Sequence, residues 1–220
     1  MAYQIAVDGP SGSGKSTLAK GVAKKLGIMY LDTGAMYRTC GLSALKKGID
    51  PSDPVAVENM LQTMKLDIEF RDGIQHMILD GEDVTGMIRT PEVSMAASSI
   101  SALPVIRNAM VDMQRKIASS QSFVIDGRDI ASNVLPNAKY KFFVTASAEK
   151  RAERRLLELN NNGNFSQNYE EVLADIIKRD KQDSEREFAP LRQVPEAIVI
   201  DTSDIGIEET LETLLSYIKE

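Results

Sequence analysis

Residues 9–16 read Gly-Pro-Ser-Gly-Ser-Gly-Lys-Ser and match the pattern G-x-x-x-x-G-K-[ST]. Glycines allow the main chain to curl so that successive N–H groups point inward, and a helix that begins there adds its positive end. A lysine adds a mobile cation, and a serine hydroxyl is a ligand for magnesium. This spacing predicts a triphosphate site in which Lys15 contacts the β and γ phosphates and Ser16 contacts the metal.

The expected cofactors are therefore ATP and Mg²⁺. A turn that merely joins a strand to a helix has no need of Lys and Ser after the last glycine, so the functional interpretation is preferred. A GTP-driven switch is disfavoured because the sequence contains no N-K-x-D motif, and Asp126-Gly127-Arg128-Asp129 replaces the Asp-Glu of motor ATPases. A small-molecule kinase fits better. The residues expected to hold the nucleotide are Gly9, Pro10, Ser11, Gly12, Ser13, Gly14, Lys15, Ser16 and Thr17.

The elements around this loop predict an α/β fold. A short apolar run, 5–7, precedes the loop, and helical spacing follows it through 16–26. The next strand and helix give a βαβα order, which favours a parallel sheet flanked by helices. Further strands are expected at 29–31, 123–125, 141–144 and 197–200, and further helices at 35–47, 148–159, 169–183 and 207–219.

The pattern changes in the middle of the chain. A helix at 55–64 leads into two alternating runs, 66–70 and 75–79, which predict a hairpin around Asp72-Gly73. A third small strand is expected at 83–85. Helices follow at 93–99 and 107–119, with Pro104 separating them. We expect a single domain over 1–220 that carries an antiparallel insertion subdomain at about 60–100.

Composition limits the partners and the location. The formal net charge of −6 argues against general affinity for a nucleic-acid backbone. The only cysteine, Cys40, cannot form a disulfide within the chain, and the first residues lack the pattern of a secretion signal. No apolar run approaches the roughly 18 residues of a membrane helix. A cytoplasmic protein with no membrane or nucleic-acid partner is expected.

Several motifs together resemble those of the bacterial cytidylate kinases. They are the phosphate loop, the segment Leu-Asp-Thr-Gly-Ala-Met-Tyr-Arg at 31–38, Asp-Gly-Arg-Asp at 126–129, and Arg179-Asp180 followed by Asp183 and Arg186. They occur in order along nearly the whole chain. The stretch 81–93 also resembles the insertion that marks this family.

The resemblance implies a P-loop kinase with a parallel sheet core, a mobile acceptor region that contains the insertion, and a short lid at about 155–168. It implies transfer of the γ-phosphoryl group of ATP to CMP or dCMP, giving ADP and CDP or dCDP. We expect a monomer whose partners are small molecules. Two alternatives remain open at this point. One is another small-molecule P-loop kinase, of the UMP or shikimate type, and the other is a non-catalytic ATP-binding switch.

The resemblance also assigns the acceptor site. Arginine forks match phosphate geometry, and carboxylates and hydroxyls can read the cytosine edge. Family members carry Ser where this chain has Thr33, which leaves the choice between ribose and deoxyribose open. Asp129 is expected to hold Arg128 in place. The residues expected to bind the acceptor are Thr33, Arg38, Arg107, Arg128, Asp129, Asp183 and Arg186.

Phosphoryl transfer needs cations around the group that moves. Arg151, Arg154 and Arg155 share one face of the helix that leads into the predicted lid loop, 160–164. They either reach the transferring group or form a solvated face balanced by glutamates. Lys15, Arg128, Arg154 and Arg155 are predicted as the catalytic residues.

Overall fold

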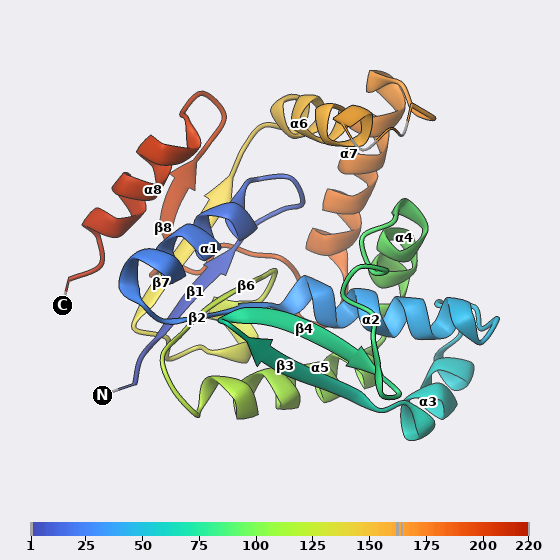
Figure 1. Cartoon of the computed structure of the whole chain (residues 1–220). Coiled ribbons are helices and arrows are strands. Elements are labelled where there is room, and N and C mark those ends of the chain that lie inside the picture. Colours follow the sequence, from blue (N-terminus) through green and yellow to red (C-terminus); the bar gives the residue numbers. More distant parts are fainter. Residues whose placement is uncertain (1, 162, 164, 220) are drawn as a thin grey trace. The chain divides into compact units, whose positions relative to one another are not determined.

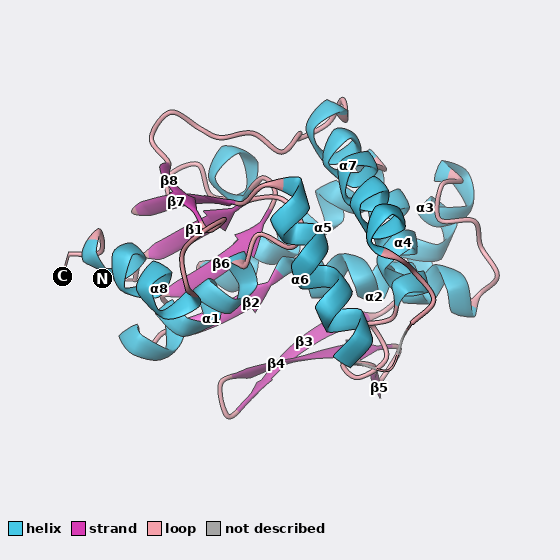
Figure 2. Ribbon diagram, turned by 90° about the horizontal axis from the view of Figure 1, so that it is seen from above, coloured by secondary structure: helices cyan, strands magenta, loops and turns pink. Residues whose placement is uncertain are grey.

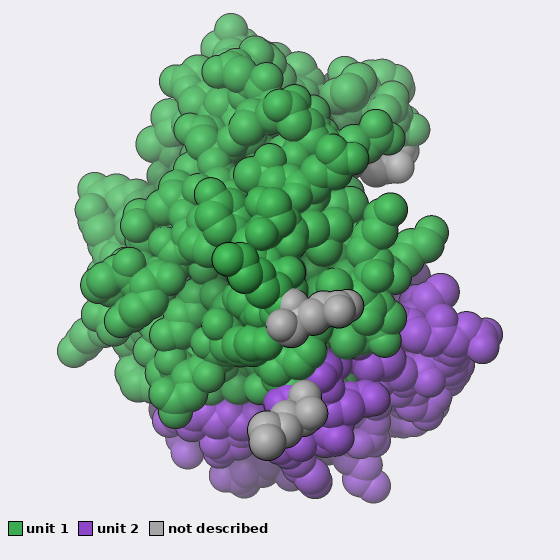
Figure 3. All heavy atoms as spheres, turned by 90° about the vertical axis from the view of Figure 1, so that its left-hand side faces the viewer, with its two compact units in different colours: residues 1, 3–28, 123–220 green, residues 2, 29–122 purple. Residues whose placement is uncertain are grey.

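The computed structural model describes residues 2–161, 163 and 165–219. Its chain forms two compact units, which Figure 3 colours separately. Unit 1 combines two segments that are far apart in the sequence, Tyr3–Ile28 and Phe123–Glu220, whereas unit 2 consists of the segment Met29–Ser122 together with Ala2. Of the predicted lid loop, Asn162 and Asn164 lie outside the described residues.

Unit 1 contains a parallel sheet (Figure 1). Its strands lie in the order β6-β1-β7-β8, and their pairings place Val7 opposite both Asp126 and Phe142. Strands buried on both faces need continuous apolar runs, and Ile5, Ala6 and Val7 are fully buried. The prediction of a parallel core is confirmed. The bounds are β1 Gln4–Asp8, β6 Phe123–Gly127, β7 Tyr140–Thr145 and β8 Ile198–Asp201.

The helices of unit 1 pack on this sheet and on one another. Helices α1 and α8 lie side by side (Figures 1 and 2), and a Cβ on Gly21 would come within 2.9 Å of Leu211. Helices α6 and α7 share a small apolar core that includes Leu159 and Ile176. The helices are α1 Lys15–Leu26, the π-helix η1 Ile130–Val134, α6 Ala148–Asn161, α7 Tyr169–Glu185 and α8 Ile207–Ser216.

Unit 2 contains the antiparallel insertion, whose strands lie in the order β3-β4-β5. Figure 2 shows β3 and β4 as a twisted hairpin. Helices α2 and α4 approach closely, since a Cβ on Gly41 would lie 2.8 Å from the Ala97 nitrogen. The elements are β2 Met29–Asp32, α2 Thr33–Lys46, α3 Pro54–Thr63, β3 Leu66–Arg71, β4 Ile74–Leu79, β5 Glu82–Asp83, α4 Pro91–Ile100 and α5 Pro104–Ala118.

Three local details differ from the sequence-based expectation. Strand β5 covers only Glu82–Asp83 instead of 83–85. Two separate helices are present as expected, but the second, α5, begins at Pro104 itself and not at 107, a position where the missing N–H of proline costs nothing. The π-helix Ile130–Val134 was not predicted. No helix in the described part of the chain is long and apolar enough to cross a membrane.

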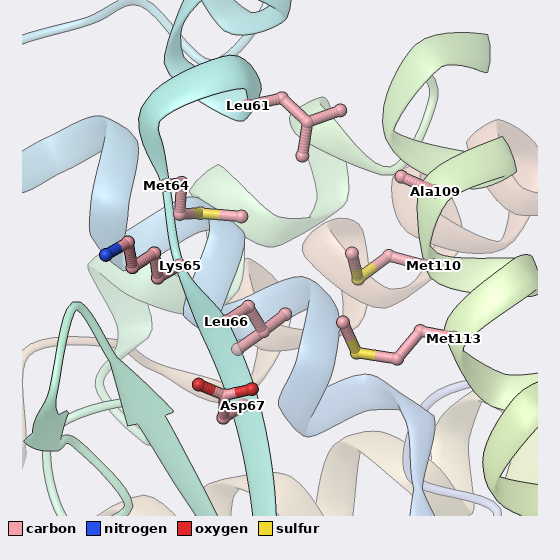
Figure 4. Close-up of a pocket in the computed structure, with 8 residues that line it drawn as sticks. All are labelled: Leu61, Met64, Lys65, Leu66, Asp67, Ala109, Met110 and Met113. Atoms are coloured by element: carbon pink, nitrogen blue, oxygen red, sulfur yellow. The ribbon is translucent and has the colours of Figure 1, made fainter.

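A cavity of about 320 Å³ lies within unit 2, away from the phosphate loop in the sequence (Figure 4). Side chains from the end of α3, the start of β3 and one face of α5 form its wall. None of the residues predicted for the site lines it. The lining residues are Leu61, Met64, Lys65, Leu66, Asp67, Ala109, Met110 and Met113.

Candidate active site

The loop between β1 and α1 depends on its glycines. Gly12 and Gly14 have φ angles of 77° and 84°, which favour glycine strongly. A Cβ on Gly9 would lie 2.0 Å from the Val144 carbonyl oxygen, so only glycine fits there. Gly14 is the N-cap of α1, and no side chain of the described residues caps it. The N–H groups at the start of α1 are thus available to an anion.

The Lys15 side chain folds over this loop. Its Nζ donates a hydrogen bond to the Pro10 carbonyl oxygen at 3.0 Å. Burial, followed by repulsion from Arg128, lowers the pKa of Lys15 to about 7. A nearby anion would restore the charge of this ammonium group. The arrangement therefore suits a polyphosphate, because a buried cation whose charge is not fully balanced by nearby carboxylates attracts an anion strongly.

Ser16 and Asp126 meet at the carboxyl end of the sheet. The Ser16 hydroxyl donates to the Asp126 carboxylate over 2.6 Å. Asp126 is buried and ends the apolar part of β6. A hydroxyl and a carboxylate next to a phosphate site are oxygen donors of the type that Mg²⁺ prefers, so these residues fit the metal.

Arg151 braces the phosphate loop from helix α6. Its guanidinium makes two hydrogen bonds to Asp180 of α7, at 2.9 and 2.6 Å. The same group donates to the Ser11 carbonyl oxygen at 3.2 Å. The helix lies so close to the loop that a Cβ on Gly12 would be 3.2 Å from the Arg151 Cβ. Arg151 therefore supports the phosphate loop by donating a hydrogen bond to one of its main-chain carbonyl groups.

Arg154 and Arg155, both predicted to be catalytic, have different surroundings. Arg154 donates to the Thr202 hydroxyl at 2.9 Å and also to the Thr202 carbonyl oxygen. That hydroxyl lies within donating distance of two carbonyl oxygens, that of Ser13 at 3.0 Å and that of Thr145 at 3.1 Å, so Arg154 is connected to the phosphate loop through Ser13. Arg155 instead pairs with Glu158 at 2.8 Å on the same helix. In this structure the guanidinium groups of Arg154 and Arg155 therefore bind different partners and do not converge on one position.

Four residues predicted for the acceptor form a cluster in unit 1. The Arg128 Nε donates to Asp183 at 2.8 Å, and Arg186 lies 3.8 Å from the same carboxyl group. Arg186 also lies 3.7 Å from Asp129. Burial raises the pKa of Asp183, but the charges of Arg128 and Arg179 outweigh it and hold that pKa below its ordinary value. The cluster presents ionised groups of both signs.

One detail of this cluster differs from the expectation. Asp129 was expected to hold Arg128, yet the carboxylate that pairs with Arg128 is Asp183. Asp129 accepts a hydrogen bond from the Asn133 amide at 2.9 Å. Helix α7 ends at Glu185, so Arg186 is its C-cap and not a further helical residue.

The remaining predicted acceptor residues lie in unit 2. Thr33 is buried at the first position of α2, and Arg38 lies one turn further along. Arg107 of α5 is almost fully buried, donates to the Ser101 carbonyl oxygen at 3.1 Å, and lies 5.3 Å from the centre of the Tyr37 ring. An arginine buried against a ring and a carbonyl keeps a fixed direction.

Several residues of these clusters were not among the site residues predicted from the sequence. Asp8, Asp32 and Asp180 carry buried or paired carboxylates, and Arg89 and Thr202 make contacts to such groups or to the loop. Asp8 and Asp32 each end a short apolar run, as Asp126 does, and that shared position was the available signal. No local pattern distinguishes Thr202, because its partner Ser13 lies 189 positions away.

Comparisons with known proteins give a consistent result. A family model described as Cytidylate kinase matches residues 5–220. A cytidylate kinase from Caldicellulosiruptor bescii is 49% identical over 96% of this chain and 93% of its own length. Those from Clostridioides difficile and Thermosipho melanesiensis are 48% and 46% identical, over 97% and 100% of this chain and 97% and 98% of their own lengths.

Solved structures show a more distant likeness. A shikimate kinase from Bacteroides thetaiotaomicron has a TM-score of 0.50 and 12% identity, with 98% of each chain covered. An uncharacterized protein from Eubacterium ventriosum has a TM-score of 0.52 and 14% identity, with 98% of this chain and 97% of that one covered. At such identities the likeness concerns the fold alone.

Proposed function

Since the chain belongs to the cytidylate kinase family, we propose that it transfers the γ-phosphoryl group of ATP to CMP or dCMP, giving ADP and CDP or dCDP. The observation that carries this proposal is the complete phosphate loop, with Lys15 buried over it and Ser16 hydrogen-bonded to Asp126. A non-catalytic switch would have no need of the separate arginine and carboxylate cluster around Arg128 and Asp183.

The donor is proposed to bind with its phosphates along the loop between β1 and α1. The N–H groups from Gly12 to Ser16 point toward the phosphate oxygens, and Lys15 leaves the Pro10 carbonyl to contact the β and γ groups. Ser16 and Asp126 would hold Mg²⁺, which would supply positive charge that offsets the charge of the phosphates. Arg154 is directed to the donor side through Thr202.

The acceptor is proposed to be held by two kinds of group. Arg38, Arg107 and Arg128 bind the monophosphate, because guanidinium forks match its oxygens. Asp183, Arg186 and Thr33 provide the hydrogen-bond acceptors and donors that cytosine requires, and Asp129 orients Arg186.

Transfer requires positioning and charge stabilisation and no general base. The attacking oxygen of the monophosphate is already anionic at neutral pH, and the guanidinium groups neutralise charge on the group in flight. Arg128 serves both the acceptor and the transition state. Arg155 is proposed to join it only after leaving Glu158, whose exposed ion pair contributes little.

A coupled assay of ADP release tests this proposal. With Mg²⁺ and ATP, turnover is expected with CMP and dCMP and to be much slower with UMP, AMP or shikimate. Lys15→Met should abolish turnover while the circular dichroism spectrum stays unchanged, and Lys24→Met, an exposed change on the same helix, should keep full activity. A best substrate other than CMP or dCMP would contradict the acceptor assignment. ATP binding without acceptor-stimulated turnover would favour a switch.

The remaining expectations are part of the same proposal. The partners are small molecules, with no membrane or nucleic acid among them, and the enzyme acts as a monomer in the cytoplasm. The net charge of −6 supports the lack of a nucleic-acid partner. Size-exclusion chromatography with light scattering checks the monomer, which has a mass of 24.2 kDa.

A further inference from the structure

The side chain of a glutamine in the insertion hairpin pairs with the main chain at the turn between β2 and α2, in the way that a neighbouring β-strand would. The Gln75 Oε1 accepts a hydrogen bond from the Asp32 N–H at 2.7 Å, and its Nε2 donates to the Asp32 carbonyl oxygen at 3.2 Å. A carboxamide carries one acceptor and two donors in a plane, so it can pair with both backbone groups of a single residue. The half-buried Gln75 side chain thereby fixes the main chain at the last residue of β2.

The side chain of Asp32 is held as firmly as its backbone. One carboxylate oxygen accepts from the Ala35 N–H at 2.9 Å and caps α2, and the other accepts from the Arg89 guanidinium at 2.9 Å. Burial raises the pKa of Asp32, but the charges of Arg38 and Arg89 outweigh it and hold that pKa below its ordinary value. All four polar groups of Asp32 are thus engaged, two of them by Gln75 and a third by Arg89.

The residues next to Asp32 are those assigned to the acceptor. Thr33 follows Asp32 directly in the sequence. The Arg38 guanidinium lies near the Asp32 carboxylate, since a Cβ on Gly34 would be 3.2 Å from the Arg38 Nη1 and 3.1 Å from the Asp32 Oδ1. A shift of the Asp32 main chain would displace the Thr33 hydroxyl and turn the first helical residues of α2. The position of both acceptor contacts therefore depends on how Asp32 is held.

We propose that Gln75, acting through Asp32, is a positioning residue for the acceptor nucleotide. The hairpin locks the turn that carries Thr33 and Arg38, and so contributes to CMP binding without touching the nucleotide. Arg89 completes the lock on the carboxylate side. This inference rests on the proposed function of the site, and it gives the insertion a specific task within that function.

Two substitutions at Gln75 test the idea by different chemistry. Gln75→Met keeps the length of the side chain but removes both hydrogen bonds to Asp32. Gln75→Glu keeps the acceptor for the Asp32 N–H, loses the donor and adds a negative charge near the Asp32 carboxylate. The matched control is Gln62→Met, the same change at an exposed position of α3 in the same unit.

Initial rates are measured with CMP varied at saturating ATP and with ATP varied at saturating CMP. Both Gln75 variants are expected to raise the KM for CMP about tenfold, which corresponds to about 1.4 kcal/mol. The kcat and the KM for ATP should change less than about twofold, because the phosphate loop is untouched. Calorimetric titration with CMP alone should show the same loss of affinity, and Gln62→Met should behave as the unsubstituted protein does.

The possible failures are distinguishable. If the unsubstituted protein does not phosphorylate CMP, the proposed function fails. If it does, and the Gln75 variants bind CMP normally, the positioning role alone is overturned. An equal fall in activity toward both substrates, or loss of folding in both variants, would also overturn it, since Gln75 would then be a general structural residue.

Discussion

Two buried ionisable groups frame the phosphate loop, and burial opposes the charge of both. Asp8 ends β1 just before the loop, and Lys15 follows it. Burial raises the pKa of Asp8 to about 7, even though its carboxylate accepts hydrogen bonds from the Ile130 and Ala131 N–H groups at 2.8 Å each. Burial shifts the pKa of Lys15 in the opposite direction, from its ordinary value of 10.5 down to about 7. Both groups therefore change charge near neutral pH.

Binding of ATP is expected to be coupled to proton uptake through Lys15. At pH 8 the ammonium group of the free protein is largely deprotonated, since its pKa is about 7. Triphosphate charge raises that pKa, so binding takes up as much as one proton. Calorimetry at pH 8 in two buffers of different ionisation enthalpy measures this uptake. It should persist in Asp8→Asn and disappear at pH 6, and a heat of binding independent of the buffer at pH 8 would contradict it.

Asp8 is expected to make the folded protein less stable as the pH rises from about 4 to about 7. Its folded pKa lies above its ordinary value of 3.8, so the folded protein binds the extra proton across this window. The contribution is fully present below pH 3.8 and lost through pH 7, with a size on the order of 2 to 4 kcal/mol. Urea unfolding between pH 4.5 and 7.5 measures it.

The control variant is Asp8→Asn, and the quantity compared is the slope of the free energy of unfolding against pH, not the free energy of unfolding at one pH. Asp8→Asn cannot titrate, so its free energy of unfolding should lose this downward slope even though the variant is less stable overall. Asp32 and Asp183, whose pKa values are lowered, act in the opposite sense below about pH 4 and do not obscure the window. An unchanged slope in Asp8→Asn would show that another group is responsible.

The residues of the loop could be predicted from the sequence because their roles follow from a local pattern. Spacing alone predicts that Lys15 contacts phosphate and that Ser16 contacts the metal. The partners of Arg154 and Arg128 could not be predicted this way, since Thr202 and Asp183 lie 48 and 55 positions further along. A side chain's chemistry is visible in the sequence, but its nearest carboxylate or carbonyl is set by the tertiary fold.

At the scale of elements, two hydrogen bonds from Arg154 to Thr202, one to its hydroxyl and one to its carbonyl oxygen, link α6 to the connection between β8 and α8. Thr202 accepts a hydrogen bond from Arg154 and donates to Ser13, so it connects the helix before the predicted lid with the phosphate loop. Mutual support of this kind keeps a main-chain loop in one shape while its ligand is absent.

Thr202→Val is therefore expected to weaken ATP binding and spare CMP binding. Removing the hydroxyl leaves the Ser13 carbonyl and one Arg154 donor without this partner, at a cost of about 1 to 2 kcal/mol, or roughly tenfold in the KM for ATP. Steady-state kinetics with each substrate varied measure the effect. Thr213→Val, an exposed change on α8, is the matched control, and an equal rise in both KM values would contradict the assignment.

Most elements follow from periodicity, and the exceptions have physical reasons. The apolar runs at β1 and β6 and the helical spacing of α1 fix their positions within one or two residues. The π-helix Ile130–Val134 has no such pattern, because its first N–H groups bind the Asp8 carboxylate, 122 positions earlier. Strand β5 is set by two pairings to β4 and not by its own sequence.

At the scale of the whole molecule, the two units differ in how their segments come together. The strands of the β3–β4 hairpin are joined by Asp72 and Gly73, and apart from Ala2 unit 2 is one continuous segment. In unit 1, β1 pairs with β6, so Ile5 lies opposite Val124. Closing a long loop costs more entropy than closing a short one, so distant pairings form later.

We expect pulse-labelling hydrogen exchange during refolding from urea to show this order. Amides of β3 and β4 should gain protection before those of β1, because the hairpin is local. Mass spectrometry of peptides that cover 66–79 and 4–8 provides the measurement. Protection of β1 at the same time as the hairpin, or before it, would contradict the expected order.

The central place of β1 has a consequence for the newborn chain. β1 is translated more than a hundred codons before its two neighbours in the sheet, β6 and β7. Until Thr145 has been added, β1 lacks one of its two neighbouring strands, and the phosphate loop that follows β1 is not held by a complete sheet. The proposed affinity for ATP is thus expected to arise late in translation, and a chain that terminates before β7 is expected to contain the phosphate-loop motif but not to bind ATP.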